Sequence, residues 1–513
     1  MTSYNGAQMV AQSLKDLGVE VIFGLVGIPV VQIAEEAIAL GIRFIAFRNE
    51  QAASYAATAY GYLTGRPGVC LVVGGPGVLH AMAGIEHHGM EGLELVSLMC
   101  RQMFIQGEGE YTSTQVVTSA PRPAGDPEII QKVAQLIKSA KAPLIIVGKG
   151  AAYAQAESII RQLINQTNIP FLPTPMGKGV IPDSHSSNTA TSRSAALKGA
   201  DMILVLGARL NWILHYGEAP KYNQNVNIIQ VDTSAEEIGK NNGNAELGIV
   251  GDINVVTRQL TEALQGWKYD TSSAYMKTLR ASASKNEATA AKSAKADKVP
   301  MTYGKVFDFM CLRARNTMDI SRSAFPVEHP RLRLDAGTNA TMGVGLGYAI
   351  AAHCAYNLPS REAQKSGPNS SPKKIVCLEG DSAFGFSLAE VETMARYGMD
   401  ILIFVINNGG VYQGDSESSN AWLKLQKKSE AGSKGGLRST SLGWEVGYEK
   451  VAEMCGGKGY LVHTPDELAI ATEDGFKASV PVIVNVIIEA GAQKTLEFAW
   501  QQDSKRSSTK AKL

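Results

Sequence analysis

The stretch from Lys373 to Gly410 constrains the fold more than any other part of the chain. Two apolar runs, KKIVCLEG and DILIFVIN, flank a segment with helical periodicity, which indicates strand, helix and strand in turn. Two strands joined by a helix lie parallel in one sheet. Because the same alternation recurs along the chain, we predict an α/β fold built on parallel sheets.

Changes of composition divide the 513 residues into three blocks, in line with the domain count usual for this length. We predict α/β domains at residues 1–123, 126–266 and 301–495. Residues 267–300 are polar and rich in Ala, Lys and Ser, so they form the predicted linker. Residues 496–513 form a predicted tail.

Bulk composition argues against two classes of partner. Charged residues make up 19% of the chain and the formal net charge is +1, so nothing favours nucleic acid or a membrane surface. No apolar run approaches the roughly 20 residues of a spanning helix. The six cysteines lie far apart and form no C-x-x-C pair, so we expect buried free thiols: Cys70, Cys100, Cys311, Cys354, Cys377 and Cys455.

Polar residues follow both predicted strands of the 373–410 unit. Asp381 ends the first strand, and Asn408 ends the second. Because parallel strands present their carboxyl ends at one sheet edge, these two side chains can converge. A carboxylate and an amide oxygen suit Mg²⁺, and the amides of Ser382 and Ala383 could hold a phosphate. The alternative is a helix cap at Asp381 and a turn at Asn408.

The stretch FRNEQAASYAATAYGYLTG, residues 47–65, places a carboxylate at the start of a helix rich in small side chains. Such a helix lets a backbone or a flat ligand approach closely. By itself, Glu50 can equally be a helix-start carboxylate that the helix dipole favours.

The 380–408 pattern resembles the signature of thiamine-diphosphate enzymes, G-D-x followed by 24 residues and N-N. Here 24 residues separate Ser382 from Asn407. The resemblance implies three parallel-sheet domains of the pyruvate-decarboxylase-like type, with thiamine diphosphate and Mg²⁺ as cofactors. It also assigns Mg²⁺ to Asp381, Asn408 and the Gly410 carbonyl. The cofactor-binding set that it implies is Glu50, Met342, Asp381, Ser382, Ala383, Asn408, Gly410 and Val411.

The residue 47–65 stretch resembles the pyrimidine-binding helix of the same enzymes. There a glutamate, here Glu50, hydrogen-bonds a ring nitrogen of the aminopyrimidine and favours the imino tautomer that activates the cofactor. Glu50 is therefore the predicted catalytic residue. GGPGVLHAMAG, residues 74–84, resembles the family's Gly-rich turn, and Met342 would prop the two cofactor rings in a bent shape. A tight strand-to-helix turn and a core methionine are the alternatives.

Several stretches, among them GPGVLHA, NTMDISRS and GDSAFGFS, resemble 2-hydroxyacyl-CoA lyases and oxalyl-CoA decarboxylases. The resemblance implies a carbon–carbon lyase that cleaves 2-hydroxyacyl-CoA to formyl-CoA and a shortened aldehyde, as in fatty acid α-oxidation. Its alternative is an oxalyl-CoA decarboxylase that gives formyl-CoA and CO₂. A nicotinamide dehydrogenase is disfavoured, because GKGAAY lacks the third glycine of the dinucleotide fingerprint. None of the eight histidines has metal-ligand spacing, and none is assigned a catalytic role.

The resemblance also bears on assembly and regulation. Family members pair the pyrimidine module of one subunit with the diphosphate module of another, which implies a homodimer or homotetramer. The central domain of oxalyl-CoA decarboxylases can bind ADP as an activator, and Lys149, Arg209, Asp232 and Ile253 fall where that site would be. A scaffold role for this domain is the alternative.

The chain departs from the family pattern in two places. After Ile85 the family continues through more strands and helices, whereas here the first block ends early. A strand expected before NTMDI, residues 316–320, is also skipped. The first domain is thus expected to be shortened, and a non-catalytic homologue is the third functional alternative.

The sequence ends in Ala511-Lys512-Leu513 after a polar, Lys-rich stretch. Ser-Lys-Leu at a free carboxyl terminus is a peroxisomal address read by an import receptor. Ala keeps the first side chain small, so we expect a peroxisomal location. A random basic tail is the alternative.

Overall fold

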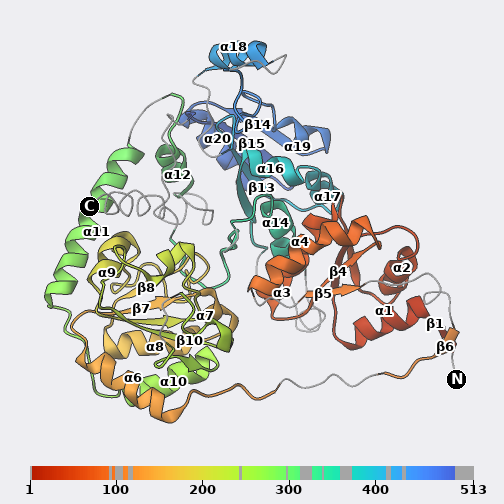
Figure 1. Ribbon diagram of the computed structural model, residues 1–513. Helices are drawn as coiled ribbons and strands as arrows, with labels where there is room; N and C mark the ends of the chain where they lie inside the picture. The colour runs from red at the N-terminus through yellow and green to blue at the C-terminus, as the bar shows by residue number, and fades with distance from the viewer. Residues whose placement is uncertain are drawn as a thin grey trace.

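A computed structural model describes residues 3–91, 95–98, 108–113, 120–241, 245–295, 299–311, 326–337, 340–358, 372–411, 418–429 and 435–490. Each of the three parts of the chain contains one parallel sheet, and the three parts occupy separate corners of the molecule (Figure 1). The predicted α/β fold is confirmed. No helix of the described residues has the length and apolar character needed to cross a bilayer.

The N-terminal part has a four-stranded parallel sheet in the order β3-β2-β4-β5, with a small antiparallel pair, β1-β6, beside it. Strand β4 is buried along its whole length, as its apolar sequence GVCLV requires. Its elements are β1 (Ser3–Asn5), α1 (Gly6–Asp16), β2 (Val21–Leu25), α2 (Val31–Ala39), β3 (Arg43–Ala46), α3 (Glu50–Thr64), β4 (Gly68–Val72), α4 (Pro76–Glu91), β5 (Leu95–Leu98) and β6 (Glu108–Glu110).

The central part has a five-stranded parallel sheet in the order β11-β10-β9-β7-β8. Its elements are α6 (Pro127–Ser139), β7 (Pro143–Val147), α7 (Lys149–Tyr153), α8 (Glu157–Thr167), β8 (Phe171–Pro173), η1 (Ala190–Ser192), α9 (Arg193–Gly199), β9 (Met202–Leu206), η2 (Trp212–Gly217), β10 (Asn227–Asp232), η3 (Ala235–Glu237), β11 (Ile249–Val250) and α10 (Ile253–Ala263). The long helix α11 (Ala274–Ala294) follows, and its first turns place Tyr275, Met276 and Leu279 in the same core.

The C-terminal part has a four-stranded parallel sheet in the order β12-β13-β15-β14. Strands β13 and β15 are buried throughout, in keeping with their apolar sequences. Its elements are α12 (Tyr303–Cys311), α14 (Gly345–Asn357), β12 (Val376–Gly380), α16 (Asp381–Ser387), α17 (Glu390–Arg396), β13 (Leu402–Asn407), α18 (Ser419–Ser429), α19 (Lys450–Met454), β14 (Lys458–Val462), α20 (Pro465–Lys477) and β15 (Val482–Ile487).

Helices α3 and α14 join the N-terminal and C-terminal parts through one continuous apolar core. The two helices run against each other where the parts meet (Figure 1). A Cβ added at Gly347 would lie 2.6 Å from the Ala52 carbonyl oxygen, so the backbones approach too closely for any side chain there. The small residues of α3 therefore allow α14 to pack closely, in addition to any ligand that they admit.

Residues 326–336 lead into the C-terminal part yet lie against the central one. The backbones of Asp183 and Val327 are hydrogen-bonded, and the Asp183 side chain accepts a second bond from the Val327 N–H at 2.8 Å. Lys178 pairs with the same carboxylate at 2.7 Å, and both side chains are more than nine-tenths buried. This ion pair and its hydrogen bond fix the segment to the central part.

Four of the six cysteines have described side chains, and all four are free thiols: Cys70, Cys354, Cys377 and Cys455. Burial raises the pKa of Cys70 and of Cys354 to about 12, so both thiols stay protonated and unreactive. Free thiols are thus confirmed for the described part of the chain, and burial for three of the four, since Cys455 is partly exposed. The side chains of Cys100 and Cys311 lie outside it.

Candidate active site

The turn after β13 brings the predicted metal ligands together. The N–H of Gly410 donates to Asp381 Oδ2 at 3.1 Å and to Asn408 Oδ1 at 3.2 Å. The carboxylate and the amide oxygen come from different strands, and because they share one donor they must be neighbours. β12 pairs in register with β13, Gly380 opposite Ile406, and this pairing carries both side chains to the same edge.

A second asparagine, Asn407, maintains the shape of the turn and does not face the same way. Its side chain accepts from the Gly409 N–H at 3.1 Å and donates to Asn485 Oδ1 at 3.1 Å. The Asn408 amide instead donates to the hydroxyl of Tyr303 at 3.1 Å, which directs its oxygen towards Asp381 and Gly410. The two adjacent asparagines thus have separate tasks.

Residues 440–444 cover the turn from outside. The carbonyl of Gly409 accepts from the Leu442 N–H, and the Val411 N–H donates to the Thr440 carbonyl, both at 2.8 Å. Gly409 has φ +73°, a conformation that favours glycine, and a Cβ added there would lie 3.3 Å from the Trp444 ring. The peptide of Gly410 is therefore held in place from both sides.

Asp381 has the environment of a cation ligand. Its residue is 2% exposed, and burial raises its pKa to about 6 even though backbone N–H groups donate to it. A buried carboxylate of this kind is costly unless a cation compensates for it. The carboxylate and the amide oxygen are hard oxygen ligands of the kind that suit Mg²⁺, whose shell phosphate oxygens and water usually complete. Among the described residues no cluster of three or more His, Cys, Asp or Glu offers another metal site.

The remaining cofactor residues predicted in this part surround the start of α16. The Ser382 N–H donates to its neighbour Asp381 Oδ1 at 2.9 Å, so in this structure that amide is engaged by the carboxylate. Met342 is partly exposed beside Gly343, which has φ +78° and lies against Phe386 and the Ala383 carbonyl. The loop 340–344 and the start of α16 are therefore adjacent.

Glu50 is the first residue of α3, and Asn49 caps the helix by accepting from the Gln51 N–H at 2.8 Å. The Glu50 side chain is 16% exposed, and its Oε2 lies 3.1 Å from His80 Nδ1. A Cβ added at Gly77 would lie 3.3 Å from Glu50 Oε1. Gly77 of the GGPG turn therefore lies directly against the carboxylate, where a larger residue would crowd it.

Glu390, on α17 of the C-terminal part, fixes the backbone just before α3. Its carboxylate accepts from the Arg48 N–H at 3.1 Å and from the Thr393 hydroxyl at 2.7 Å. It is fully buried, and burial raises its pKa to about 7. The position of Glu50 therefore depends on a residue of the opposite domain.

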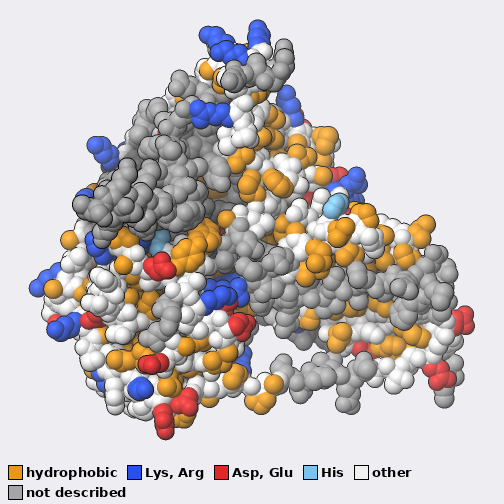
Figure 2. Space-filling view, in the orientation of Figure 1, with side chains coloured by type: hydrophobic (Ala, Val, Ile, Leu, Met, Phe, Trp, Pro, Cys, Tyr) orange, Lys and Arg blue, Asp and Glu red, His pale blue; other side chains and the backbone are white. Residues whose placement is uncertain are grey.

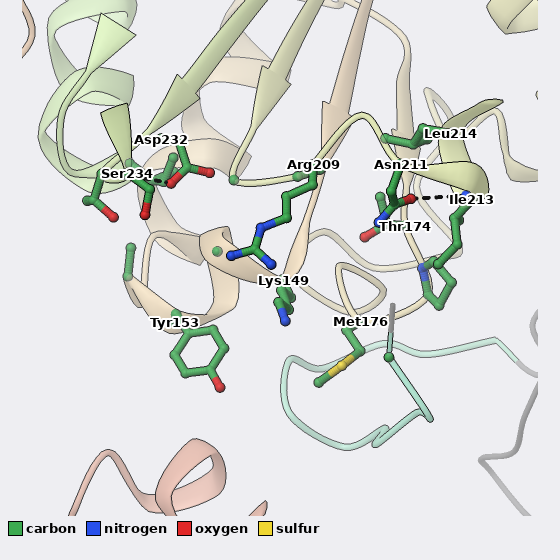
Figure 3. A pocket seen from close by; sticks show the side chains of 18 of the residues that line it. Lys149, Tyr153, Thr174, Met176, Arg209, Asn211, Ile213, Leu214, Asp232 and Ser234 are labelled. Atoms are coloured by element: carbon green, nitrogen blue, oxygen red, sulfur yellow. Dashed lines mark hydrogen bonds between the residues drawn. The ribbon is translucent and has the colours of Figure 1, made fainter. Parts of the chain in front are cut away.

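A cavity of about 340 Å³ lies in the central part, at the carboxyl ends of β7, β9 and β10. The side chains of Lys149 and Arg209 extend into it, and Asp232 lies at one side with its carboxylate accepting from the Ser234 N–H at 3.0 Å (Figure 3). Burial raises the pKa of Asp232. Ile253 and Asp335 also line the cavity. The four residues predicted for a nucleotide site are thus brought together.

Three residues of the site escaped sequence reasoning: His80, Tyr303 and Glu390. Tyr303 lies 105 positions from its partner Asn408, and Glu390 lies 342 positions from Arg48, so no local pattern reveals either contact. His80 had a usable signal, since it follows the Gly-rich turn by three residues.

Comparison with known proteins identifies the class. Profiles of thiamine pyrophosphate enzymes match residues 4–118 with the N-terminal TPP binding domain, 130–260 with the central domain and 315–486 with the C-terminal TPP binding domain. These matches follow the three sheets and place the two candidate sites in the two TPP binding domains.

Curated relatives narrow the class. The chain is 39% identical to human 2-hydroxyacyl-CoA lyase 1 (97% of this chain, 96% of the relative). It is 37% identical to 2-hydroxyacyl-CoA lyase of Arabidopsis thaliana (96% and 97%), and 30% identical to oxalyl-CoA decarboxylase of Escherichia coli K12 (95% of each). The chain belongs to the thiamine pyrophosphate enzymes and, within them, to the family of 2-hydroxyacyl-CoA lyases and oxalyl-CoA decarboxylases.

The alignments also bear on the expected shortening. The alignment with the human protein covers 574 positions, whereas 97% of this 513-residue chain is about 498 residues, so about 76 positions have no residue from this chain. Segments of that relative are therefore missing inside this chain.

Proposed function

We propose that the protein is a thiamine-diphosphate-dependent carbon–carbon lyase that cleaves 2-hydroxyacyl-CoA to formyl-CoA and an aldehyde one carbon shorter. The bond between the thioester carbon and C2 breaks, the hydroxyl of C2 becomes the aldehyde, and its proton is balanced by the one that formyl-CoA gains. The observation that carries the proposal is the convergence of Asp381 and Asn408 on the Gly410 peptide, in a chain whose most similar curated relatives include several lyases.

In this proposal each side chain has a separate task. Asp381, Asn408 and the Gly410 carbonyl hold Mg²⁺ on the diphosphate, with Ser382, Ala383, Val411 and Met342 around the cofactor. Glu50 hydrogen-bonds a ring nitrogen of the aminopyrimidine. When bound, thiamine diphosphate supplies the carbon nucleophile and electron sink that the cleavage needs.

The test uses purified protein with thiamine diphosphate and Mg²⁺, offered 2-hydroxyacyl-CoA and oxalyl-CoA in parallel. Formyl-CoA with an aldehyde from the first substrate supports the lyase. Preferential formyl-CoA and CO₂ from the second supports the decarboxylase, which the 30% identity to the E. coli enzyme keeps as the alternative. Formyl-CoA from neither, with cofactor bound, would make the chain a non-catalytic homologue.

We infer that the working form is a homodimer or homotetramer. Exposed apolar side chains lie in both domains that carry the candidate half-sites: Ile28 (79%), Leu79 (72%) and Met82 in the N-terminal part, and Phe386 (56%) on α16, the helix that begins at Asp381. Figure 2 shows apolar side chains spread over the N-terminal part and the adjoining C-terminal helices. Burial of such side chains favours association. Light scattering that finds an active monomer would contradict this inference.

We further propose that the central cavity takes a nucleoside diphosphate such as ADP. Lys149 and Arg209 would pair with the phosphates, and Asp232 at the end of β10 would accept from ribose hydroxyls. Calorimetry with ADP tests this, with Arg209→Ala as the variant expected to weaken binding. Absence of heat from the wild-type protein would leave the domain a scaffold.

The peroxisomal location is a separate proposal, because residues 504–513 lie outside the described part of the chain. We propose that Ala511-Lys512-Leu513, when it stands at a free carboxyl terminus, is read by the peroxisomal import receptor. A fluorescent protein fused ahead of residues 504–513 should enter peroxisomes as a Ser-Lys-Leu control does. A diffuse cytosolic signal would remove the proposed location.

A further inference from the structure

His80 makes the hydrogen bond that orients Glu50. Its Nδ1 lies 3.1 Å from Glu50 Oε2, and this is the one hydrogen bond of the Glu50 side chain within the described part of the chain. A carboxylate only accepts, so the contact requires a hydrogen on Nδ1. The other oxygen, Oε1, lies against Gly77, which has no side chain.

The packing of α3 against α4 fixes this contact. The Ser54 hydroxyl donates to the Ala81 carbonyl at 2.8 Å, and the Thr58 hydroxyl donates to the Gly84 carbonyl at 3.3 Å. A Cβ at Gly84 would lie 2.0 Å from Ser54 Oγ, so the helices are in direct contact. His80 is one residue before Ala81, and the register of the two helices therefore places it beside the first residue of α3.

The two partners differ in their surroundings. The Glu50 side chain is mostly enclosed, whereas the His80 side chain is 59% exposed. An exposed histidine contributes little to the core, and a surface ion pair stabilises a protein by about 0–1 kcal/mol. Fold stability thus gives no strong reason for a histidine at this position. Orientation of the enclosed Glu50 carboxylate does give a reason for His80, because a carboxylate that hydrogen-bonds a ring nitrogen has to be held in one orientation.

We propose that His80 is a positioning residue, which holds Glu50 Oε2 so that Oε1 is presented to the ring nitrogen of the aminopyrimidine. The inference rests on the proposed function, because it assigns Glu50 the cofactor contact. It gives His80 a positioning role, whereas the sequence assigned no histidine a catalytic one.

The experiment compares His80→Leu with His80→Asn. Asparagine carries its amide nitrogen on Cγ, as histidine carries Nδ1, so it can still donate to Glu50, whereas leucine cannot. For each purified protein, with thiamine diphosphate and Mg²⁺, three quantities are measured. They are the near-ultraviolet circular dichroism bands of the amino and imino tautomers, kcat and KM for 2-hydroxyacyl-CoA, and the thermal midpoint.

His80→Leu should weaken the imino band and lower kcat by about tenfold, as loss of a hydrogen bond to a charged group implies, with KM little changed. His80→Asn should recover most of both signals, and the thermal midpoints should agree. Wild-type tautomer bands and kcat in His80→Leu would overturn the proposal, as would an Asn variant as impaired as the Leu variant.

The design separates this proposal from the proposed substrate. If the wild-type protein shows tautomer bands but releases no formyl-CoA, the substrate is wrong, and the bands of the two variants still decide the role of His80. A wild-type protein that shows no bands with the cofactor overturns both.

Discussion

Glu50 and Asp381 occupy equivalent places in two different domains. Each is the first residue of a helix that follows an edge strand of a four-stranded parallel sheet, β3 for Glu50 and β12 for Asp381. Their surroundings differ. Asp381 is buried among backbone N–H groups and shares the Gly410 N–H with the Asn408 side-chain oxygen, whereas Glu50 meets the His80 imidazole and lies against Gly77.

The difference shows how one topological position serves two chemistries. A helix start beyond a parallel strand offers donors and a favourable dipole to any acidic side chain. A carboxylate buried beside a second oxygen, as Asp381 is, suits a cation. A carboxylate held by a single hydrogen-bond donor, as Glu50 is, can still bind a neutral ring. The four substitutions below test this division of tasks.

Glu50→Gln should have the largest effect. It retains the shape of the side chain but removes the charge, and turnover should fall by about 1,000-fold, within the range of lost proton-transfer catalysis. Binding of the Mg²⁺–diphosphate moiety should change little, as measured by calorimetry with thiamine diphosphate. Near-normal turnover would break the assignment of Glu50.

Asp381→Ala should show the converse pattern. The affinity for thiamine diphosphate in Mg²⁺ should fall by about 100-fold, because the only charged ligand of the proposed site is lost. At saturating cofactor part of the turnover should return, which is not expected of Glu50→Gln. If cofactor affinity is unchanged, the metal site lies elsewhere.

Glu390→Gln tests the link between the two domains through pH. The folded pKa of Glu390 is raised from its ordinary value of 4.5 to about 7, so the folded state prefers the neutral form and loses stability as pH rises through this interval. Above pH 7 the neutral glutamine should be more stable than wild type, by at most about 3 kcal/mol for a shift of this size. Thermal midpoints recorded from pH 4 to 8 should converge at the acidic end. A difference independent of pH would contradict the argument.

Tyr303→Phe should have the smallest effect. It removes the acceptor that orients Asn408, and the affinity for Mg²⁺ should fall by about fivefold, the value of one hydrogen bond. Tyr448→Phe is a matched control, since Tyr448 is also close to Asp381 but its hydroxyl makes no hydrogen bond within the described residues. If the two substitutions lowered the affinity for Mg²⁺ equally, Tyr303 would not be the residue that orients Asn408.

The sequence predicted what local pattern can carry. The alternation of apolar runs predicted the three parallel sheets. The 24-residue spacing predicted that Asp381 and Asn408 lie at one sheet edge, because the lengths of the strands and of the helix between them can be estimated from local sequence. The contacts of Glu390 with Arg48 and of Tyr303 with Asn408 depend on how whole domains pack, which no short pattern encodes. His80 was overlooked for another reason, since histidines were judged by metal-ligand spacing alone.

Small residues illustrate the same limit. The small residues of α3 predict the close approach of a backbone or a flat ligand, and in the structure the backbone of α14 at Gly347 approaches Ala52. A pattern of small side chains predicts close approach but does not name the approaching group.

The contact of residues 326–336 with the central part bears on how this chain can be divided. A fragment confined to residues 126–266 would lose Tyr275, Met276 and Leu279 from its core and would leave Asp183 without the Val327 N–H. If residues 126–266 were replaced by the central part of a relative, only one side of the buried interface with residues 326–336 would be exchanged. An autonomous folding unit here must be assembled from two separate stretches, joined by a linker that replaces the residues between α11 and residue 326.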